Sequence, residues 1–142
     1  MNRKKGFTLA ELLIVVTIIG VLVAVSVPIF TAQRSKAVDA VNKANIRAAK
    51  SMALAAFYDD KTKYVESSYG TKMAYFKYTD GRLDPITGKK SHEVNKMART
   101  VCAQAAQHKQ CDYIYVYVSL NDAKPIQTAP YLDQNGNIKG ND

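Results

Sequence analysis

The sequence predicts an α+β protein in which a long N-terminal α-helix packs on a small antiparallel β-sheet. An apolar run fills residues 7–30. Residues 31–69 contain no proline or glycine that would interrupt a helix continuing from it. Alternating aromatic and polar residues begin only after that point. Alternation with a period of two is typical of strands, whereas spacings of three and four residues are typical of helices. The length of 142 residues fits one folded domain beside the apolar run.

The apolar run has the length and flanks of a membrane-spanning helix. Three of the first five residues are basic, and between Phe7 and Phe30 only Glu11 carries a charge. As a helix, these residues would extend roughly 36 Å, enough to cross a hydrocarbon core of about 30 Å. The basic flank predicts that the N-terminus stays on the cytoplasmic side. A cleaved secretory signal fits less well, because the run is long and no small-x-small site ends it.

A simple single-pass anchor also remains open from these residues. In that interpretation Glu11 lies near the membrane interface, where an acidic side chain close to a helix start interacts favourably with the helix dipole.

Residues 5–13, Lys-Gly-Phe-Thr-Leu-Ala-Glu-Leu-Leu, resemble the class III signal of type IV pilins and pseudopilins. The resemblance covers the chain from Lys5 to about Phe30. It implies that residues 1–6 are a leader peptide and that prepilin peptidase cuts between Gly6 and Phe7, then methylates the amino group of Phe7. Residues 7–30 would be the transmembrane and later filament-core helix. Residues 31–142 would comprise the amphipathic half of the helix and a globular α+β head.

By the same resemblance, Glu11 is the acid that lies near the amino group of a neighbouring subunit. A lone carboxylate in hydrocarbon costs about 2.5–3.5 kcal/mol on insertion scales. Cleavage would create an ammonium group on Phe7, four residues from Glu11, and this group could pair with the carboxylate within one subunit or between two.

Gly20 and Pro28 interrupt the apolar run with poor helix formers. Glycine costs about 1 kcal/mol and proline about 3 kcal/mol in a helix interior. The residues between them are rich in β-branched valine, which tolerates extended backbone. A kinked transmembrane helix would explain them, while the pilin resemblance implies a segment that unwinds in the filament.

The remaining chain predicts a helix and several strands. An apolar stripe should place the aqueous half of the first helix on a sheet; it comprises Val38, Val41, Ala44, Ala48, Met52 and Ala55. A strand over residues 73–78 should have Ala74, Phe76 and Tyr78 on one face and Met73, Tyr75 and Lys77 on the other. Turns are predicted at Asp80-Gly81, Asp84-Pro85 and Thr87-Gly88.

Farther along, Ser91 should cap a helix that runs to about His108. Its apolar stripe comprises Val94, Met97, Ala98, Val101 and Ala105. The strand Tyr113 to Leu120 should place aliphatic residues on the long helix. Its three tyrosines would be exposed or covered by a loop or the second helix. A strand near Ile126 to Leu132 should pair with it across Asn121-Asp122, before a turn at Asn135-Gly136.

Chemical sites are sparse in this sequence. Cys102 and Cys111 are a candidate disulfide in an extracellular protein, and their position departs from the C-terminal cysteine loop of many Gram-negative pilins. Zinc binding by these cysteines with His92 and His108 lacks the usual ligand spacing. The string Asp133 to Asn137 has its glycine too early for a calcium loop. We therefore expect no metal, no cofactor and no enzymatic activity.

The chain carries 20 basic and 12 acidic residues, a net charge of +8. Removal of residues 1–6 would leave +5 before the new amino terminus is counted. A basic surface would include Lys89, Lys90, Lys96, Arg99 and Lys109. Solvated lysines explain such a surface, although salt-sensitive binding of nucleic acid remains an alternative.

By the resemblance, the leading function is a structural subunit of a type IV pilus that supports adhesion, aggregation or motility. Its partners would be identical or related pilin subunits, prepilin peptidase, an assembly platform and a motor ATPase. The precursor would lie in the cytoplasmic membrane and the mature subunit in an extracellular filament. A secretion pseudopilin, a competence pseudopilin for DNA uptake and a monomeric anchored surface protein are the alternatives.

Overall fold

A computed structural model describes residues 6–59, 66–68, 71–87, 91–119 and 126–140 of the chain. The chain divides into two compact units, Met1–Ser35 and Lys36–Asp142. Helix α1, Leu9–Asp59, has 51 residues and belongs to both units, which confirms the predicted long N-terminal helix. The basic flank Arg3 to Lys5, the turn at Gly88 and the predicted turn Asn121-Asp122 lie outside the described residues.

In the first unit, α1 presents apolar side chains on every side. The large aliphatic residues from Leu9 to Ile29 are all more than half exposed. The helix continues through Gly20 and Pro28 without interruption. By length and composition, it can cross a membrane.

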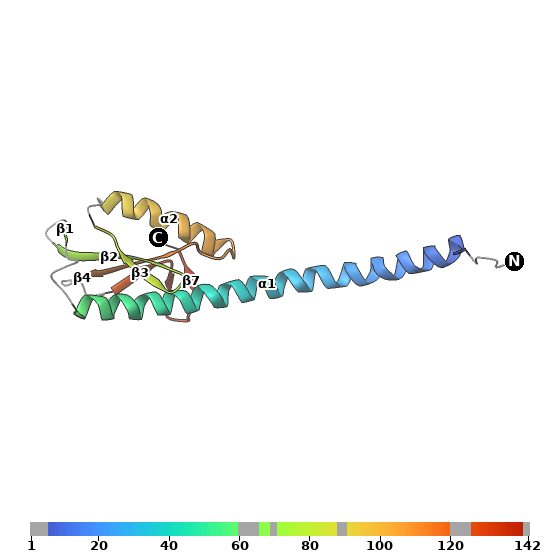
Figure 1. The fold of residues 1–142 in the computed structure, drawn as a ribbon, viewed down its shortest axis with the longest axis horizontal. Coiled ribbons are helices and arrows are strands. Elements are labelled where there is room, and N and C mark those ends of the chain that lie inside the picture. The colour runs from blue at the N-terminus through green and yellow to red at the C-terminus, as the bar shows by residue number, and fades with distance from the viewer. Residues whose placement is uncertain (1–5, 60–65, 69–70, 88–90, 120–125, 141–142) are drawn as a thin grey trace. The chain divides into compact units, whose positions relative to one another are not determined.

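The second unit is built on a five-stranded antiparallel sheet with the order β1-β2-β4-β5, in which β3 also pairs with β2. The elements of this unit are β1 Glu66–Ser68, β2 Thr71–Thr79, β3 Arg82–Pro85, α2 Ser91–Ala106, β4 Ile114–Ser119 and β5 Ile126–Ala129. A separate two-stranded sheet pairs β6, Tyr131–Leu132, with β7, Ile138–Lys139. Within this unit the sheet lies between the C-terminal part of α1 and helix α2 (Figure 1). This confirms the α+β arrangement.

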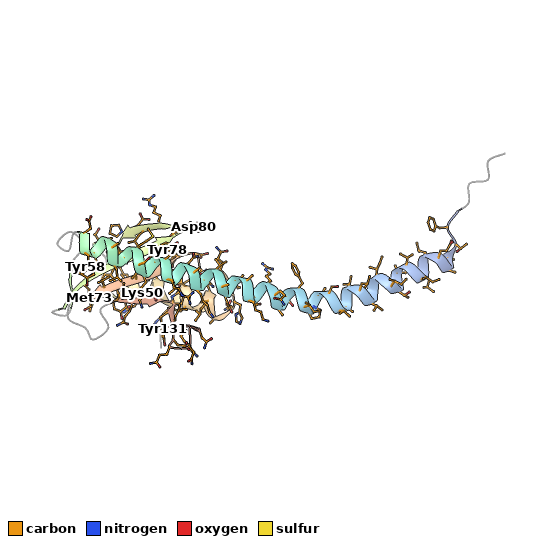
Figure 2. All side chains as sticks on the ribbon, turned by 90° about the horizontal axis from the view of Figure 1, so that it is seen from below. Lys50, Tyr58, Met73, Tyr78, Asp80 and Tyr131 are labelled. Carbon is orange, nitrogen blue, oxygen red and sulfur yellow. The ribbon has the colours of Figure 1, made fainter. Side chains whose placement is uncertain are left out.

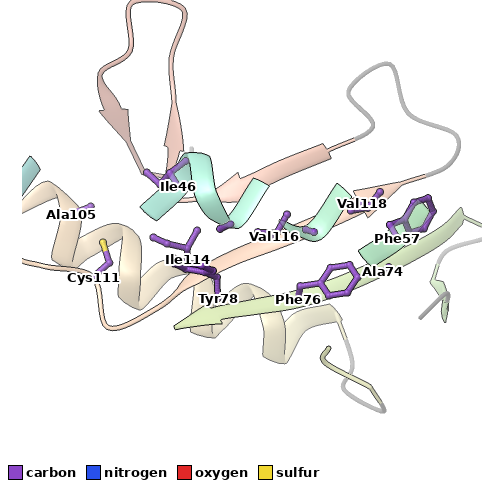
Figure 3. Close-up of a cluster of buried hydrophobic side chains, with 12 residues drawn as sticks. Ile46, Phe57, Ala74, Phe76, Tyr78, Ala105, Cys111, Ile114, Val116 and Val118 are labelled. Atoms are coloured by element: carbon purple, nitrogen blue, oxygen red, sulfur yellow. The ribbon is translucent and has the colours of Figure 1, made fainter. Parts of the chain in front are cut away.

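The sheet separates two apolar clusters because successive strand residues point to opposite faces. Ile46 and Phe57 of α1 pack in one cluster with buried side chains of β2 and β4 (Figure 3). Those strand residues are Ala74, Phe76, Tyr78, Ile114, Val116 and Val118. The second cluster joins α2 to Tyr115 and Ala129 on the other face. The predicted alternation in residues 73–78 is therefore confirmed.

The predicted stripe on α1 is correct only in part: Ala48 and Met52 pack against the apolar cluster, but the fully buried positions are shifted by about one residue. The buried residues are Asn42, Ile46, Ala49, Ala53 and Phe57. Val41 is 44% exposed, and Ala44 and Ala55 are exposed as well. Alanines occur on every face of this helix, so apolarity alone did not select the buried face. A polar residue, Asn42, lies at the centre of contact instead.

Of the predicted turns, the one at Asp84-Pro85 is wrong, because both residues lie in β3 and pair with β2, whereas the one at Asp80-Gly81 is confirmed. Asp80 and Gly81 form a two-residue hairpin loop with positive φ angles of 46° and 83°, as a type I′ turn requires. Helix α2 covers Tyr115, which is 3% exposed and donates its hydroxyl to the sulfur of Met97 at 3.0 Å. The covering of this tyrosine by the second helix was one of the predicted alternatives.

The strand predicted from Ile126 to Leu132 is divided in two. Ile126–Ala129 pairs with β4, whereas Tyr131–Leu132 pairs with β7. Pro130 separates them, since proline has no N–H group to continue the ladder. The turn at Asn135-Gly136 is confirmed, and Gly136 has a φ of 74°.

Asn42 connects α1 by side-chain hydrogen bonds to the segment between α2 and β4. Its side chain is fully buried, and its Nδ2 donates to the carbonyl of Lys109 at 2.9 Å. Its Oδ1 accepts the backbone N–H of Cys111 at 3.0 Å. Nearby, Nδ1 of His108 lies 2.9 Å from Oδ2 of Asp39. These contacts hold together segments almost 70 positions apart.

We expect Asn42→Ala to lower the free energy of unfolding by about 2–4 kcal/mol, because two backbone groups lose their buried partner. Chemical denaturation of the full-length protein in detergent micelles, followed by tyrosine fluorescence, measures this. Asn45→Ala, three positions along the same helix and half-buried, is the matched control and should change stability by less than about 0.5 kcal/mol. Equal losses in both variants would contradict the assigned role.

Candidate functional site

The start of α1 forms a capping box around Glu11. The backbone N–H and the hydroxyl of Thr8 both donate to Oε2 of Glu11, each at 2.8 Å. In return, the N–H of Glu11 donates to the hydroxyl of Thr8 at 3.3 Å. A threonine before the first helical residue and a glutamate three positions later satisfy backbone donors that have no partner in the helix.

The sequence analysis missed this role of Thr8. Its signal is the Thr-x-x-Glu spacing before an apolar run. The predicted partner of Glu11 was the amino group of Phe7 after cleavage. In the uncut chain the partner of the Glu11 carboxylate is instead Thr8, the residue after Phe7. Glu11 is thus hydrogen-bonded before any ammonium group exists.

Gly6 and Phe7 precede the helix and are accessible. Helix α1 begins at Leu9, and the side chain of Phe7 is 90% exposed. A Cβ atom built on Gly6 would meet no atom within 4 Å. The predicted cleavage bond therefore lies in an open segment next to the capping box, a position where a peptidase can reach the backbone.

Hydroxyl groups bond to backbone carbonyls around Pro28. Ser26 donates to the carbonyl of Leu22 at 2.7 Å, and Thr31 donates to that of Pro28 at 2.9 Å. Pro28 has no N–H group, so the carbonyl of Ala24 loses its usual helical donor. The helix therefore lacks one backbone hydrogen bond at this point. Unwinding between Gly20 and Pro28 stays a prediction.

Cys102 and Cys111 are both buried, and no disulfide joins them in this structure. Sγ of Cys111 lies 3.7 Å from the carbonyl of Val101. Burial, together with the nearby Cys102 and Asp112, raises the pKa of Cys111 to about 11. The two cysteines are close enough to influence each other electrostatically, while the disulfide itself stays a prediction.

The other predicted sites are dispersed. Within the described part of the chain, no three His, Cys, Asp or Glu side chains form a group that could hold a metal ion. The side chain of His92, and Lys89 and Lys90 entirely, lie outside that part. Lys96, Arg99 and Lys109 are exposed.

The segment Asp133 to Asn137 forms the turn of the β6–β7 hairpin and not a calcium loop. Oδ1 of Asp133 accepts the backbone N–H groups of Asn135 and Asn137 at 2.9 and 2.8 Å. These bonds, that from Asn137 above all, hold the pKa of Asp133 below its usual value. The carboxylate therefore serves to fix the turn.

Comparison with known proteins bears on the N-terminal segment. Residues 1–27 match the prokaryotic N-terminal methylation motif. The chain is 37% identical over 71 residues to "Type IV major alpha-pilin" of Moraxella bovis, covering 50% of this chain and 45% of that protein. Over part of its length the chain is therefore similar to type IV pilins.

Two further relatives match part of the chain. "Fimbrial protein Q" of Moraxella bovis is 40% identical over 62 residues, which cover 44% of this chain and 40% of that protein. "Type IV major pilin protein PilA" of Myxococcus xanthus (strain DK1622) is 39% identical over 62 residues, covering 44% and 28%. The matches thus span less than half the length of these relatives. No solved structure matches this chain.

We expect Thr8→Val to destabilise the first turn of α1. Loss of the cap should cost about 1 kcal/mol, which corresponds to roughly fivefold faster amide exchange at residues 9–11. Hydrogen exchange followed by NMR in micelles measures it. The control is Thr17→Val, whose hydroxyl bonds only to carbonyls of the preceding turn. Unchanged exchange in Thr8→Val would show that the box is not formed.

We expect Cys111 in the reduced protein to react slowly with iodoacetamide at pH 8. The thiolate is the nucleophile, so a pKa near 11 instead of 9 lowers its population about a hundredfold. Labelling should accelerate about tenfold per pH unit until pH approaches 11. Mass spectrometry of the digested protein measures it, with the guanidinium-unfolded chain as control. Equal rates in the two states would contradict the assigned burial.

Proposed function

We propose that this protein is a structural subunit of a type IV pilus, assembled through packing of its N-terminal helix and supporting adhesion, aggregation or motility. The observation that carries the proposal is the exposed apolar surface of residues 7–30 with the single carboxylate of Glu11 at its start. The names of the matched relatives, major pilins and a fimbrial protein, support a pilus subunit over a secretion or competence pseudopilin.

Burial of this apolar surface would drive assembly in two steps. In the bilayer, lipid tails cover the side chains, and the capping box reduces the cost of Glu11 because Thr8 supplies two donors. In a filament, neighbouring helices would replace lipid. The carboxylate would then face an ammonium group on the cleaved Phe7 of a neighbour, which compensates its charge as well as its hydrogen bonds.

Processing would precede assembly. Prepilin peptidase would cut the open segment between Gly6 and Phe7 and methylate Phe7. By the resemblance to type IV pilins, a platform protein and a motor ATPase would then extract the subunit. The apolar helix and the methylation motif fit a membrane-anchored precursor that ends in an extracellular filament. In that filament the head serves a structural role without catalysis.

The oxidation state of the two cysteines would change on export. In an oxidising compartment Cys102 and Cys111 would form a disulfide between α2 and the start of β4. Closing a loop this short would stabilise the head by roughly 2–3 kcal/mol. Alkylation of the unfolded protein with and without prior reduction distinguishes the bridged form from two free thiols.

We expect Glu11→Gln to reduce surface filaments about ten- to a hundredfold. A charged hydrogen bond of roughly 1.5–3 kcal/mol per subunit is lost, whereas the apolar surface is unchanged. Immunoblots of sheared filaments and membranes measure the distribution, and Glu93→Gln on α2 is the control. N-terminal sequencing should find methylated Phe7 in both variants. Normal filaments in Glu11→Gln would refute the assembly role, and an intact Met1 in the native protein would favour a simple anchor.

A further inference from the structure

Strand β5 forms an open edge of the head's sheet. It pairs with β4 through four residue pairs, from Tyr115 with Ala129 to Val118 with Ile126. In the described part of the chain, no strand pairs with its other side. Alternate backbone N–H and C=O groups of an edge strand point away from the sheet and can pair with a further strand.

A hollow of about 660 Å³ adjoins this edge. It is lined by residues 126–128 of β5, by residues 131–134, and by Ile46, Arg47 and Lys50 of α1. Figure 2 labels Lys50 on α1 and Tyr131 on β6, which both contribute to this lining. The volume lies in the range of known ligand sites. The hollow therefore leaves room beside the backbone of β5.

The charge of the hollow favours an anionic occupant. Arg47 and Lys50 are exposed and lie three positions apart, so they share one side of α1. The acidic residue in the lining is Asp133, whose Oδ1 already accepts two backbone N–H groups of its own turn. The two cations are thus available to a partner.

The faces of the sheet specify where the partner's charges would lie. Ile126 packs on the cluster that includes α1, whereas Ala129 belongs to the cluster under α2. A strand added beside β5 would continue this alternation. Every second side chain of that strand would therefore lie on the α1 side, next to Arg47 and Lys50.

We propose that the open edge of β5 binds an extended peptide segment of another protein as an added strand, with acidic side chains at alternate positions that pair with Arg47 and Lys50. Backbone hydrogen bonds would supply affinity and the two cations specificity. Four residues of β5 extend about 13 Å, so a segment of roughly four to six residues suffices. The proposal does not depend on filament assembly, because α1 contributes only residues of the head unit.

The test uses the full-length protein in zwitterionic micelles and the capped hexapeptide Val-Glu-Val-Glu-Val-Glu. Saturating peptide should slow amide exchange at outward-facing positions among residues 126–129 by at least tenfold, as measured by NMR. The double variant Arg47→Gln, Lys50→Gln should weaken binding three- to tenfold. The matched control is Lys96→Gln, Arg99→Gln on α2, which removes the same charge at the same spacing from exposed positions and should leave affinity unchanged.

Two peptide controls separate the backbone from the charge. A Val-Lys repeat should bind at least tenfold more weakly, and a Val-Glu repeat with N-methylated backbone amides should give no protection of β5. Absence of binding by the acidic peptide, or equal weakening by both double variants, would overturn the proposal. Binding of polygalacturonate without binding of the peptide would identify a saccharide site and would overturn it as well.

Discussion

The packing of the C-terminal part of α1 on the sheet is the interaction on which the head depends. Ile46 and Phe57 cover strands β2 and β4, which otherwise expose their aliphatic face. Between these two residues, α1 presents the small, fully buried alanines at positions 49 and 53 to the sheet. Small side chains allow a helix to approach strands closely. Close approach in turn makes the contact specific, since a larger side chain at either position would separate the layers.

Asn42 adds direction to this apolar contact. Hydrophobic burial alone would tolerate rotation of the helix or a shift along the sheet, because it is not directional. An amide that pairs with one carbonyl and one N–H of a distant segment is satisfied in a single register. The connection between α2 and β4 is thereby held against α1, which fixes the start of β4. A buried polar residue thus determines how the apolar layers align.

These two contacts explain what the sequence could and could not predict. Alternation in residues 73–78 and 114–118 identified strands and their buried faces, because β-strand periodicity is simple and the residues differ sharply in polarity. The buried face of α1 was predicted only in part, because alanine is common on all its sides and because burial of Asn42 depends on backbone groups nearly 70 positions away. Pro130 could have indicated that the last strand divides. Gly6, Phe7 and Glu11 were predicted as site residues from a local motif, and the Thr-x-x-Glu spacing in the same motif could have identified Thr8 as well.

The arrangement at that helix start bears on the proposed transfer of the subunit from the membrane to a filament. Glu11 shares its Oε2 with two donors of Thr8, so its hydrogen bonds belong to its own chain and need no neighbour. A carboxylate that is hydrogen-bonded within its own chain can be accommodated in a bilayer by a single, unassociated subunit. In the proposed filament an ammonium group would compete for the same oxygen atoms and would also neutralise the charge. Exchange of one set of donors for the other changes few contacts, so the free-energy difference between stored and assembled subunits rests mainly on charge compensation and helix packing.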